Sequence, residues 1–385
     1  MLHSPQEVRR MTTYIHELSH WPIFTWDPIK LAPLLATVHQ HQGRLQGRME
    51  ALGFSLQNEA TLLTLTQDVV KNSEIENETL DPDQVRSSIA RKLGMDIAGL
   101  VPADRHVDGA VEIALDAIQH FNKPLTKERL FNWHAALFPT GRKSMNPIMV
   151  GDWRYDQHGP MQVVSGALGH QKVHFEAPTA SRIEEEMNIF LTWFNNKQSV
   201  DPTIKAGLAH LWFVTIHPFE DGNGRIARTI TDLQLARTDN NSQRFYSLSA
   251  QIRKERSSYY RQLESTQKNG LDVTDWLEWF LTCMEHALLS TTETLAKILR
   301  KARFWEQHKT VKFNDRQRLM LNNLFEKFIG KLTSSKWAKI TKCSQDTASR
   351  DIQALIELGI LAKEAAGGRS TSYVLDKGKE NKEGI

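Results

Sequence analysis

The sequence predicts a mainly α-helical protein with a short β-hairpin near its middle and a small helix and strand module at its C-terminal end. Apolar residues recur at three- and four-residue spacing over seven segments, the period of helices with one buried face. The stretch from Gly151 to Pro178 is instead rich in Gly and in short β-prone pieces. Hydrophobic residues at 40% and charged residues at 24% match ordinary globular proteins.

The expected helices follow the apolar spacing in chain order. A chain of 385 residues exceeds the usual size of one hydrophobic core, so two or three domains are expected. The helices are predicted over Leu31 to Met49, Gln57 to Asn72, Val107 to Phe121, Ile183 to Phe194, Ala206 to Ile216, Ile226 to Ala236 and Trp276 to Ile298.

The hairpin is predicted from two β-prone pieces, Met161 to Val164 and Lys172 to Phe175. They are separated by the turn-forming residues Ser165 to Gly169. Two strand-like runs with a Gly-bearing turn between them are typical of a β-hairpin. We expect this hairpin to form a flap on the helical domain.

Neither the N-terminus nor the cysteines indicate a secreted or membrane protein. The N-terminus has no apolar run after its charges, and the longest strongly apolar stretch, Ala209 to Ile216, is too short to cross a bilayer. Cys283 and Cys343 are far apart and outside any Cys-x-x-Cys spacing, which argues against a disulfide scaffold or a thiolate metal site. We expect a cytoplasmic protein without membrane contact.

The C-terminal end is more basic than the rest of the chain. The net charge is +3, and Lys and Arg outnumber Asp and Glu between Lys312 and Lys382. Ser334 to Ile340 and Gln345 to Leu358 are expected to be helices separated by a short polar turn, and residues 359–361 and 367–375 to form two strands.

This arrangement resembles a winged helix-turn-helix. In such a module the second helix reads DNA, and a strand of the wing contacts the backbone. The alternative is that the module binds protein or stabilises a homodimer, because its acidic residues dilute the positive field. The residues available for DNA are Gln345, Thr347, Ser349 and Arg350 on the helix and Arg369 on the wing.

The segment from Ile216 to Arg228, Ile-His-Pro-Phe-Glu-Asp-Gly-Asn-Gly-Arg-Ile-Ala-Arg, carries most of the functional information. A helix is expected to end near Ile216, a Gly-Asn-Gly turn follows, and a second helix begins near Arg225. Backbone N–H groups converge at such a helix start, where the helix dipole also favours an anion. The segment therefore predicts a phosphate-binding site.

The side chains around this turn suit nucleotide chemistry. Arg225 and Arg228 are three residues apart on one helix face, so two guanidinium groups could hold a polyphosphate. Asp221 offers a carboxylate to Mg²⁺, and His217 can accept a proton near neutral pH. Taken singly, each residue also has a structural interpretation as a turn, a cap or a packed histidine.

Taken together, the residues reproduce the pattern His-Pro-Phe-x-Asp-Gly-Asn-Gly-Arg-x-x-Arg, and the chain resembles the Fic family. The resemblance implies transfer of AMP from ATP to a Ser, Thr or Tyr hydroxyl of a target protein. It makes His217 the general base, Asp221 the Mg²⁺ ligand, and the hairpin the target-docking flap. The nucleotide contacts that it implies are Glu220, Asp221, Gly222, Asn223, Gly224, Arg225 and Arg228, Val163 and Val164 of the flap, and Tyr260 and Gln267 at the adenine.

A second resemblance lies in the N-terminal quarter of the chain. The runs WPIFTWDPIKLAPLLATVHQHQGRLQGRMEALG and DPDQVRSSIARKLG are similar to the helical extension that precedes many bacterial Fic domains. Between them, Asn72 to Asn77 resembles the family's inhibitory motif, with Asn72 where Ser or Thr is usual. That resemblance implies that Glu76 pairs with Arg228 and blocks productive ATP binding. On composition alone, Asn72 to Asp83 could instead be an acidic linker.

These features predict three parts: an N-terminal extension over residues 1–95, a Fic domain over 96–305 and the winged helix over 312–376. The predicted activity is protein adenylyltransfer with ATP and Mg²⁺, inhibited by Glu76. Two alternatives stay open. The chain could be a DNA-binding transcriptional regulator that uses the Fic domain as a nucleotide sensor, or a Fic enzyme that removes AMP.

Overall fold

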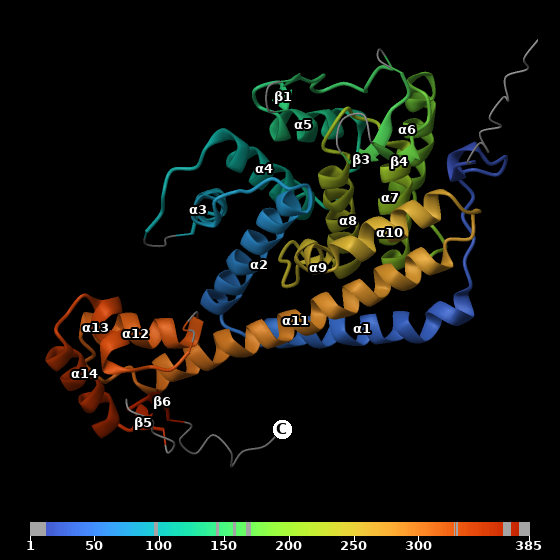
Figure 1. Cartoon of the computed structure of the whole chain (residues 1–385). Coiled ribbons are helices and arrows are strands. Elements are labelled where there is room, and N and C mark those ends of the chain that lie inside the picture. The colour runs from blue at the N-terminus through green and yellow to red at the C-terminus, as the bar shows by residue number, and fades with distance from the viewer. Residues whose placement is uncertain are drawn as a thin grey trace, which may run out of the picture. The chain divides into compact units, whose positions relative to one another are not determined.

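The fold is mainly helical, as the sequence predicts, with three two-stranded antiparallel sheets among the described residues (Figure 1). Contacts divide the chain into two compact units, Met1–Thr292 and Glu293–Ile385. The division falls inside the helix α11 (Thr274–Gln307). The computed structural model describes residues 13–95, 99–143, 146–156, 159–166, 171–326, 328, 330–364 and 371–376.

All seven helices expected from apolar spacing are present, and most extend a few residues beyond the expected ends. Apolar spacing did not indicate α3, α5, α9 and α10, which have 7 to 12 residues each. In chain order the first unit contains η1 (Ile15–Glu17), α1 (Pro28–Glu50), α2 (Phe54–Ile75), α3 (Pro82–Lys92), α4 (Arg105–Gln119), α5 (Lys127–Leu137), α6 (Ala180–Asn195), α7 (Pro202–Ile216), α8 (Asn223–Asp239), α9 (Leu248–Lys254) and α10 (Arg256–Gln267).

Polar caps explain why helices begin before their apolar residues do. The Asp27 carboxylate accepts hydrogen bonds from two backbone N–H groups at the start of α1, and Asp201 does the same at the start of α7. In both helices Pro follows the cap, at the position where its missing N–H costs nothing.

The helices α7 and α8 form a hairpin at the centre of the first unit (Figure 1). Every residue of α7 from Thr203 to Ile216 is buried, and α8 is buried over most of its length. The imidazole of His210 joins the hairpin to α10, with Nδ1 2.9 Å from Thr231 Oγ1 and Nε2 2.8 Å from the hydroxyl of Tyr259. This burial gives the loop between the two helices a rigid base.

The helix α2 lies against this hairpin. Its apolar residues join those of α3 and α4 in one core cluster, which also includes Ala236 of α8. The interpretation of residues 72–83 as a linker is wrong at both ends, because α2 continues to Ile75 and α3 begins at Pro82. Apolar spacing did not reveal the last turn of α2, since polar contacts hold it, among them Glu74 with Lys71 at 2.7 Å and with Arg253 at 3.4 Å.

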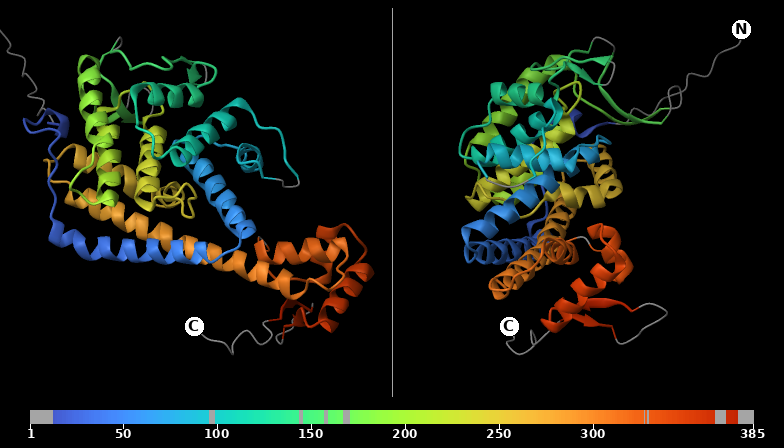
Figure 2. Two further views of the ribbon diagram at one scale, coloured as in Figure 1. Left: turned by 180° about the vertical axis from the view of Figure 1, so that it is seen from behind. Right: turned by 90° about the vertical axis from the view of Figure 1, so that its left-hand side faces the viewer.

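The expected hairpin is present as β3 (Gln162–Ser165) and β4 (Lys172–Glu176), at the edge of the helical unit (Figure 2). A smaller pair, β1 (Arg142–Lys143) and β2 (Asn146–Pro147), precedes it. The imidazole of His174 ties the hairpin to α10: its Nδ1 lies 2.6 Å from Glu264 Oε2. The flap is therefore anchored to the element that carries Tyr260 and Gln267.

The close approach of α4 and α5 depends on Gly109. A Cβ at this position would lie 1.9 Å from the carbonyl oxygen of Ala136, and backbone cannot move aside as a side chain can. We expect Gly109→Ala to lower the free energy of unfolding by about 3 kcal/mol, because the two helices must separate.

Urea denaturation of Gly109→Ala beside Gly43→Ala tests this expectation. Gly43 lies within α1 with nothing within 4 Å of an added Cβ, so Ala there should stabilise the helix by about 0.5 to 1 kcal/mol. Equal stability of the two variants would contradict the close contact of α4 with α5.

The second unit contains the two helices expected for the C-terminal module and two strands that only partly overlap the expected ranges 359–361 and 367–375, of which residues 367–370 lie outside the described structure. One apolar cluster, which includes Trp337 and Ile352, forms its core. Its elements are α12 (Asp315–Glu326), α13 (Ser334–Thr341), α14 (Gln345–Glu357), β5 (Leu361–Lys363) and β6 (Tyr373–Leu375). The predicted boundaries near residues 95 and 305–312 stay predictions. Within the described part of the chain, no helix is long and apolar enough to cross a membrane.

Candidate active site

The loop between α7 and α8 turns on two residues in the left-handed region. His217 caps α7 with φ 53°, and its N–H donates to the carbonyl of Phe213 at 3.0 Å. Gly222 precedes α8 with φ 79°, a conformation that Gly adopts without a Cβ penalty. The helix α8 begins at Asn223, two residues before the expected start at Arg225. His217 and the start of α8 therefore lie at the two ends of one short loop.

The side chain of Asn223 holds this loop together. It is buried, its Oδ1 accepts a hydrogen bond from the N–H of Phe219 at 2.9 Å, and its Nδ2 donates to the carbonyl of the same residue at 2.7 Å. The expected phosphate contact of the Asn223 amide is therefore not available in this arrangement. The residue can still offer its backbone N–H at the start of α8.

The first turn of α8 has room for the Glu76 carboxylate only because residue 224 is Gly and has no Cβ. A Cβ on Gly224 would lie 2.3 Å from Glu76 Oε1 and 3.3 Å from Arg228 Nη1. The Glu76 carboxylate thus lies directly against the helix start, the position that favours an anion. The buried Arg225 Nε and Arg228 Nη1 have no hydrogen-bond partner among the described residues. Both observations indicate an anion site with spare donors.

Arg228 is held by the end of α2. Its Nη2 lies 2.8 Å from Glu76 Oε1, and its Nε donates to Asn72 Oδ1 at 2.6 Å. The carbonyl of Asn72 accepts a further hydrogen bond from Nη2 at 3.1 Å. Asn72, where the resemblance has Ser or Thr, therefore binds Arg228 through both its side chain and its backbone.

Glu76 is ionised in this pair. Burial raises the pKa of Glu76, but the charge and hydrogen bond of Arg228 outweigh burial, so the pKa falls below its ordinary value. The hydroxyl of Tyr260 adds a hydrogen bond to Glu76 Oε2 at 3.1 Å. A carboxylate with two such partners remains charged at neutral pH.

His217 is placed to act as a base. Its Nδ1 lies 3.2 Å from the carbonyl oxygen of Val214, which can only accept, so Nδ1 carries the proton and Nε2 has the free lone pair. Burial lowers the pKa of His217 to about 4, with a smaller contribution from the charge of Arg154. The imidazole is therefore neutral at pH 7 and able to take a proton.

Comparison with known proteins agrees with this geometry. Residues 124–235, which include the whole His217 to Arg228 segment, match the Fic/DOC family. The matched region also includes α6, α7 and most of α8. Residues 14–95 match a domain of unknown function (DUF4172). These matches support membership of the Fic family.

Relatives of the Fic domain include proteins named protein adenylyltransferase Fic. The protein of that name from Aedes aegypti is 25% identical over 229 residues, which cover 58% of this chain and 40% of the relative. The protein of that name from Nematostella vectensis is 31% identical over 113 residues, 29% of this chain and 25% of the relative. The matched region thus spans less than half the length of either relative.

Solved structures share the fold. A Fic family protein from Desulfovibrio desulfuricans superposes with a TM-score of 0.54 at 21% identity, covering 92% of this chain and 98% of that one. A Fic domain containing signaling protein from Bacteroides thetaiotaomicron superposes with a TM-score of 0.50 at 19% identity, covering 68% and 97%. At these identities the likeness concerns the fold alone.

Two buried side chains that support the loop between α7 and α8 were not indicated by the sequence. Arg154 donates from Nε to the carbonyl of His217 at 2.8 Å. His134 lies beneath the loop, where its Nδ1 accepts from the N–H of Gly151 and its Nε2 donates to the carbonyl of Asp221, both at 3.2 Å. An isolated Arg or His carries no pattern, so only the three-dimensional arrangement reveals these roles.

Buried neutral histidines make the Fic domain sensitive to acid. Burial lowers the pKa of His134 to about 4 and that of His210 to about 3. The unfolded chain therefore binds protons between pH 6.5 and pH 4 that the folded chain does not, so stability is full above about pH 6.5 and falls below it. We expect each histidine to remove about 2 kcal/mol by pH 4.5.

Urea unfolding at pH 7, 5.5 and 4.5 measures this loss. His210→Gln should flatten the dependence of unfolding free energy on pH in that window. An unchanged slope would mean that His210 is not neutral in the folded state.

The structure places the other predicted nucleotide contacts in different surroundings. Glu220 Oε2 accepts from the N–H of Met149 at 2.9 Å, so here its carboxylate holds the segment before the flap. Val163 and Val164 lie in β3 of the flap. Gln267 is buried and donates to Thr215 Oγ1 at 3.2 Å. Tyr260 and Glu76 meet, as described above, so the predicted adenine pocket borders the end of α2.

A magnesium site would rest on Asp221. Among the described residues, no group of three or more His, Cys, Asp or Glu is arranged to hold a metal. Mg²⁺ does not need such a group, because it commonly binds one or two carboxylates together with phosphate oxygens and water. A single carboxylate at the edge of an anion site fits that donor set.

The predicted DNA contacts lie at the start of α14. Gln345, Ser349 and Arg350 are exposed, and Thr347 is half-buried. Ser344 caps the helix by accepting from the N–H of Thr347 at 3.2 Å. Arg369 lies outside the described residues.

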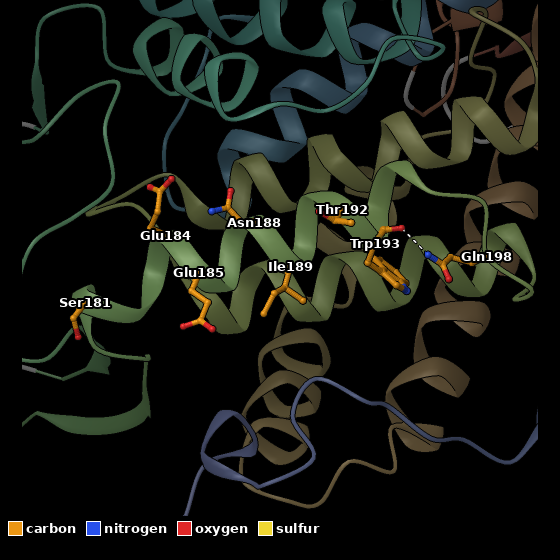
Figure 3. Close-up of a pocket in the computed structure, with 8 residues that line it drawn as sticks. All are labelled: Ser181, Glu184, Glu185, Asn188, Ile189, Thr192, Trp193 and Gln198. Carbon is orange, nitrogen blue, oxygen red and sulfur yellow. Dashed lines mark hydrogen bonds between the residues drawn. The ribbon is translucent and has the colours of Figure 1, made fainter.

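A surface groove along α6 is separate from this site. Its volume is about 810 Å³, and Figure 3 shows its side chains along α6, with Gln198 beyond the end of the helix. The groove is lined by Ser181, Glu184, Glu185, Asn188, Ile189, Thr192, Trp193 and Gln198. None of these belongs to the segment from His217 to Arg228, so the groove is not the nucleotide site.

Proposed function

We propose that this protein is an adenylyltransferase that transfers AMP from ATP to a hydroxyl of a target protein, and that Glu76 holds it in an inhibited state. The observation that carries the proposal is the Glu76 carboxylate against the start of α8, paired with Arg228 at 2.8 Å. The relatives named protein adenylyltransferase Fic support the same activity.

In this proposal ATP lies with its phosphates over the first turn of α8. The backbone N–H groups of Gly222, Asn223 and Gly224 face the α and β phosphates, and Arg225 and Arg228 bind the outer phosphates. Asp221 would hold Mg²⁺, which would neutralise part of the phosphate charge. The adenine lies near Tyr260 and Gln267.

The target hydroxyl attacks the α phosphorus. His217 Nε2 takes the hydroxyl proton as the new oxygen–phosphorus bond forms, and the bond between the α phosphorus and the bridging oxygen breaks, so pyrophosphate leaves. The flap can align an extended target segment by main-chain hydrogen bonds to β3, near Val163 and Val164, without reading much of its sequence.

Inhibition follows from charge and space. The Glu76 carboxylate occupies the anion position and neutralises Arg228, so an outer phosphate loses one donor and meets a like charge. ATP is then bound weakly or with its α phosphorus out of line with the attacking hydroxyl. Release of the end of α2 would restore the site.

Labelled ATP tests the activity. The Glu76→Gly protein, incubated with Mg²⁺ and ATP labelled at the α phosphate, should become labelled itself or label an added target. The same incubation with ATP labelled at the γ phosphate should leave protein unlabelled. Transfer of the γ label instead would mean that the protein is a kinase and not an adenylyltransferase.

The C-terminal unit supports a second candidate function. We propose that residues 312–376 form a winged helix, because a three-helix core is followed by the antiparallel pair of β5 and β6, and α14 presents exposed Gln345, Ser349 and Arg350. The protein would then be a DNA-binding regulator with the Fic domain as nucleotide sensor. DNA affinity that falls with salt and persists in a His217 variant would favour this function.

The reverse reaction is a separate alternative, in which Glu76 orients water. Removal of AMP from a modified target by the purified protein would favour it.

A further inference from the structure

The end of α2 is a tight cap that places two carboxylates side by side. Asn77 has φ 61°, and its N–H donates to the carbonyl of Glu74 at 3.1 Å. The N–H of Glu78 donates to the carbonyl of Ser73, also at 3.1 Å. This pair of hydrogen bonds across a left-handed residue is the Schellman motif, which reverses the chain at the end of a helix. Glu76 and Glu78 are the residues on either side of the reversal.

Each carboxylate meets a different arginine of the Fic motif. Glu76 pairs with Arg228 at 2.8 Å, and Glu78 forms a hydrogen-bonded ion pair with Nη1 of Arg225. The two arginines lie three residues apart on α8, so their guanidinium groups lie on the same face of the helix. Both guanidinium groups are paired with carboxylates of the same six-residue connection between α2 and α3.

Arg225 is built to hold an anion. Its guanidinium is buried and lies 4.9 Å from the centre of the Phe138 ring, which fixes its plane. Its Nε is buried without a hydrogen-bond partner in the described structure. An unpaired buried donor on a charged group is costly, so this guanidinium should bind a second anionic oxygen when one is offered.

We propose that Glu78 is a second occupant of the phosphate site, holding Arg225 while Glu76 holds Arg228, and that Asn77 positions both carboxylates. The inference rests on the proposed function, because it assumes that the two arginines bind the outer phosphates of a nucleotide. The ligand class that Glu78 opposes is then a nucleoside di- or triphosphate. A nucleoside monophosphate does not reach Arg225, so Glu78 should not affect it.

The two pairs should differ in strength. Arg225 and Arg228 are almost fully buried, but the Glu78 side chain is 39% exposed and that of Glu76 is 30% exposed. Glu76 also has the hydroxyl of Tyr260 and lies against Gly224, whereas water screens Glu78 more. Loss of Glu78 should therefore increase nucleotide affinity less than loss of Glu76.

A comparison of nucleotide binding by single and double variants tests the inference. Calorimetric titration of Glu76→Gly and of Glu76→Gly/Glu78→Gln with ATP, ADP and AMP, each with Mg²⁺, separates the two carboxylates. We expect the second substitution to tighten ATP and ADP about tenfold, or about 1.4 kcal/mol, and to leave AMP unchanged. Glu76→Gly/Glu74→Gln is the matched control, since Glu74 is a nearby carboxylate in the last turn of α2 that pairs with Lys71 and Arg253.

The outcomes distinguish this inference from the proposed function. Suppose that Glu76→Gly binds ATP but that adding Glu78→Gln does not raise the affinity for ATP, or raises the affinity for AMP as much as that for ATP. The role of Glu78 is then wrong, and the proposed function stands. If Glu74→Gln has the same effect as Glu78→Gln, the effect is general charge and the assignment to Arg225 fails. If no variant binds ATP, both proposals fail together.

The role of Asn77 has its own test in the otherwise unaltered protein. Gly accepts φ 61° without strain, whereas the branched Val does not. Asn77→Gly should keep the weak ATP affinity, and Asn77→Val should raise it, because both carboxylates lose their placement. Equal affinities in these two variants would show that the reversal does not position Glu76 and Glu78.

Discussion

Glu76→Gly should raise the rate of self-AMPylation roughly a hundredfold, which corresponds to about 2.7 kcal/mol at 25 °C. The Glu76 carboxylate lies against Gly224, pairs with Arg228 and is ionised, so it opposes a phosphate by charge and by occupancy. Its removal leaves Arg228 without a carboxylate partner and opens the first turn of α8. The measurement is the initial rate of label incorporation from ATP labelled at the α phosphate.

Two further substitutions separate the causes. Glu76→Gln keeps the shape but removes the charge, so its rate should lie between those of the unaltered protein and Glu76→Gly. Glu74→Gln removes one charge from the last turn of α2 without removing a partner of Arg228, and should leave the rate unchanged. A rate for Glu76→Gly equal to that of the unaltered protein would remove Glu76 from the mechanism.

His217→Asn in the Glu76→Gly background should lower the transfer rate by roughly 10² to 10⁴, the usual contribution of a general base. Nε2 of His217 holds the free lone pair because Nδ1 donates to Val214. Asn tolerates the left-handed conformation of residue 217, so the loop should keep its shape where Ala would add strain. ATP affinity should stay unchanged, because in the proposed mechanism His217 contacts the hydroxyl and not the phosphates.

The pH dependence of transfer gives an independent check on this base. Burial lowers the pKa of His217 to about 4, so the imidazole stays neutral and competent as the pH falls from 8 towards 5. The transfer rate should decline only near pH 4. If the base were a histidine with the ordinary pKa of about 6.5, the rate would already decline near pH 6.5. Transfer that persists in His217→Asn would show that another group takes the proton.

Most large helices of the fold were predictable because their apolar residues recur with the helical period. The helix α7 is mostly apolar on every side, and the hairpin was indicated by its Gly and β-prone residues. Short helices such as α5 and α9 were not predicted, because two or three turns contain too few repeats of the apolar spacing. The last turn of α2 was not predicted for another reason, because its stabilising contacts are ion pairs and hydrogen bonds with distant residues.

The candidate site was predictable only where its residues are contiguous. His217, Asp221 and the two arginines lie within one loop and helix start, so their spacing alone indicated a phosphate site. The Glu76 and Arg228 pair joins residues far apart in the chain, and was expected only through resemblance to the Fic family. Arg154 and Glu78 had no such indication, because nothing in the sequence tells a buried Arg or an inward-facing Glu from an exposed one.

The most direct measurement of the central claim is equilibrium binding of ATP with Mg²⁺ to the loop between α7 and α8. Glu76→Gly should bind one ATP per chain more tightly than the unaltered protein, and adding Arg228→Ala should abolish the gain. Equal binding by all three proteins, or binding by none, would contradict a phosphate site that Glu76 closes.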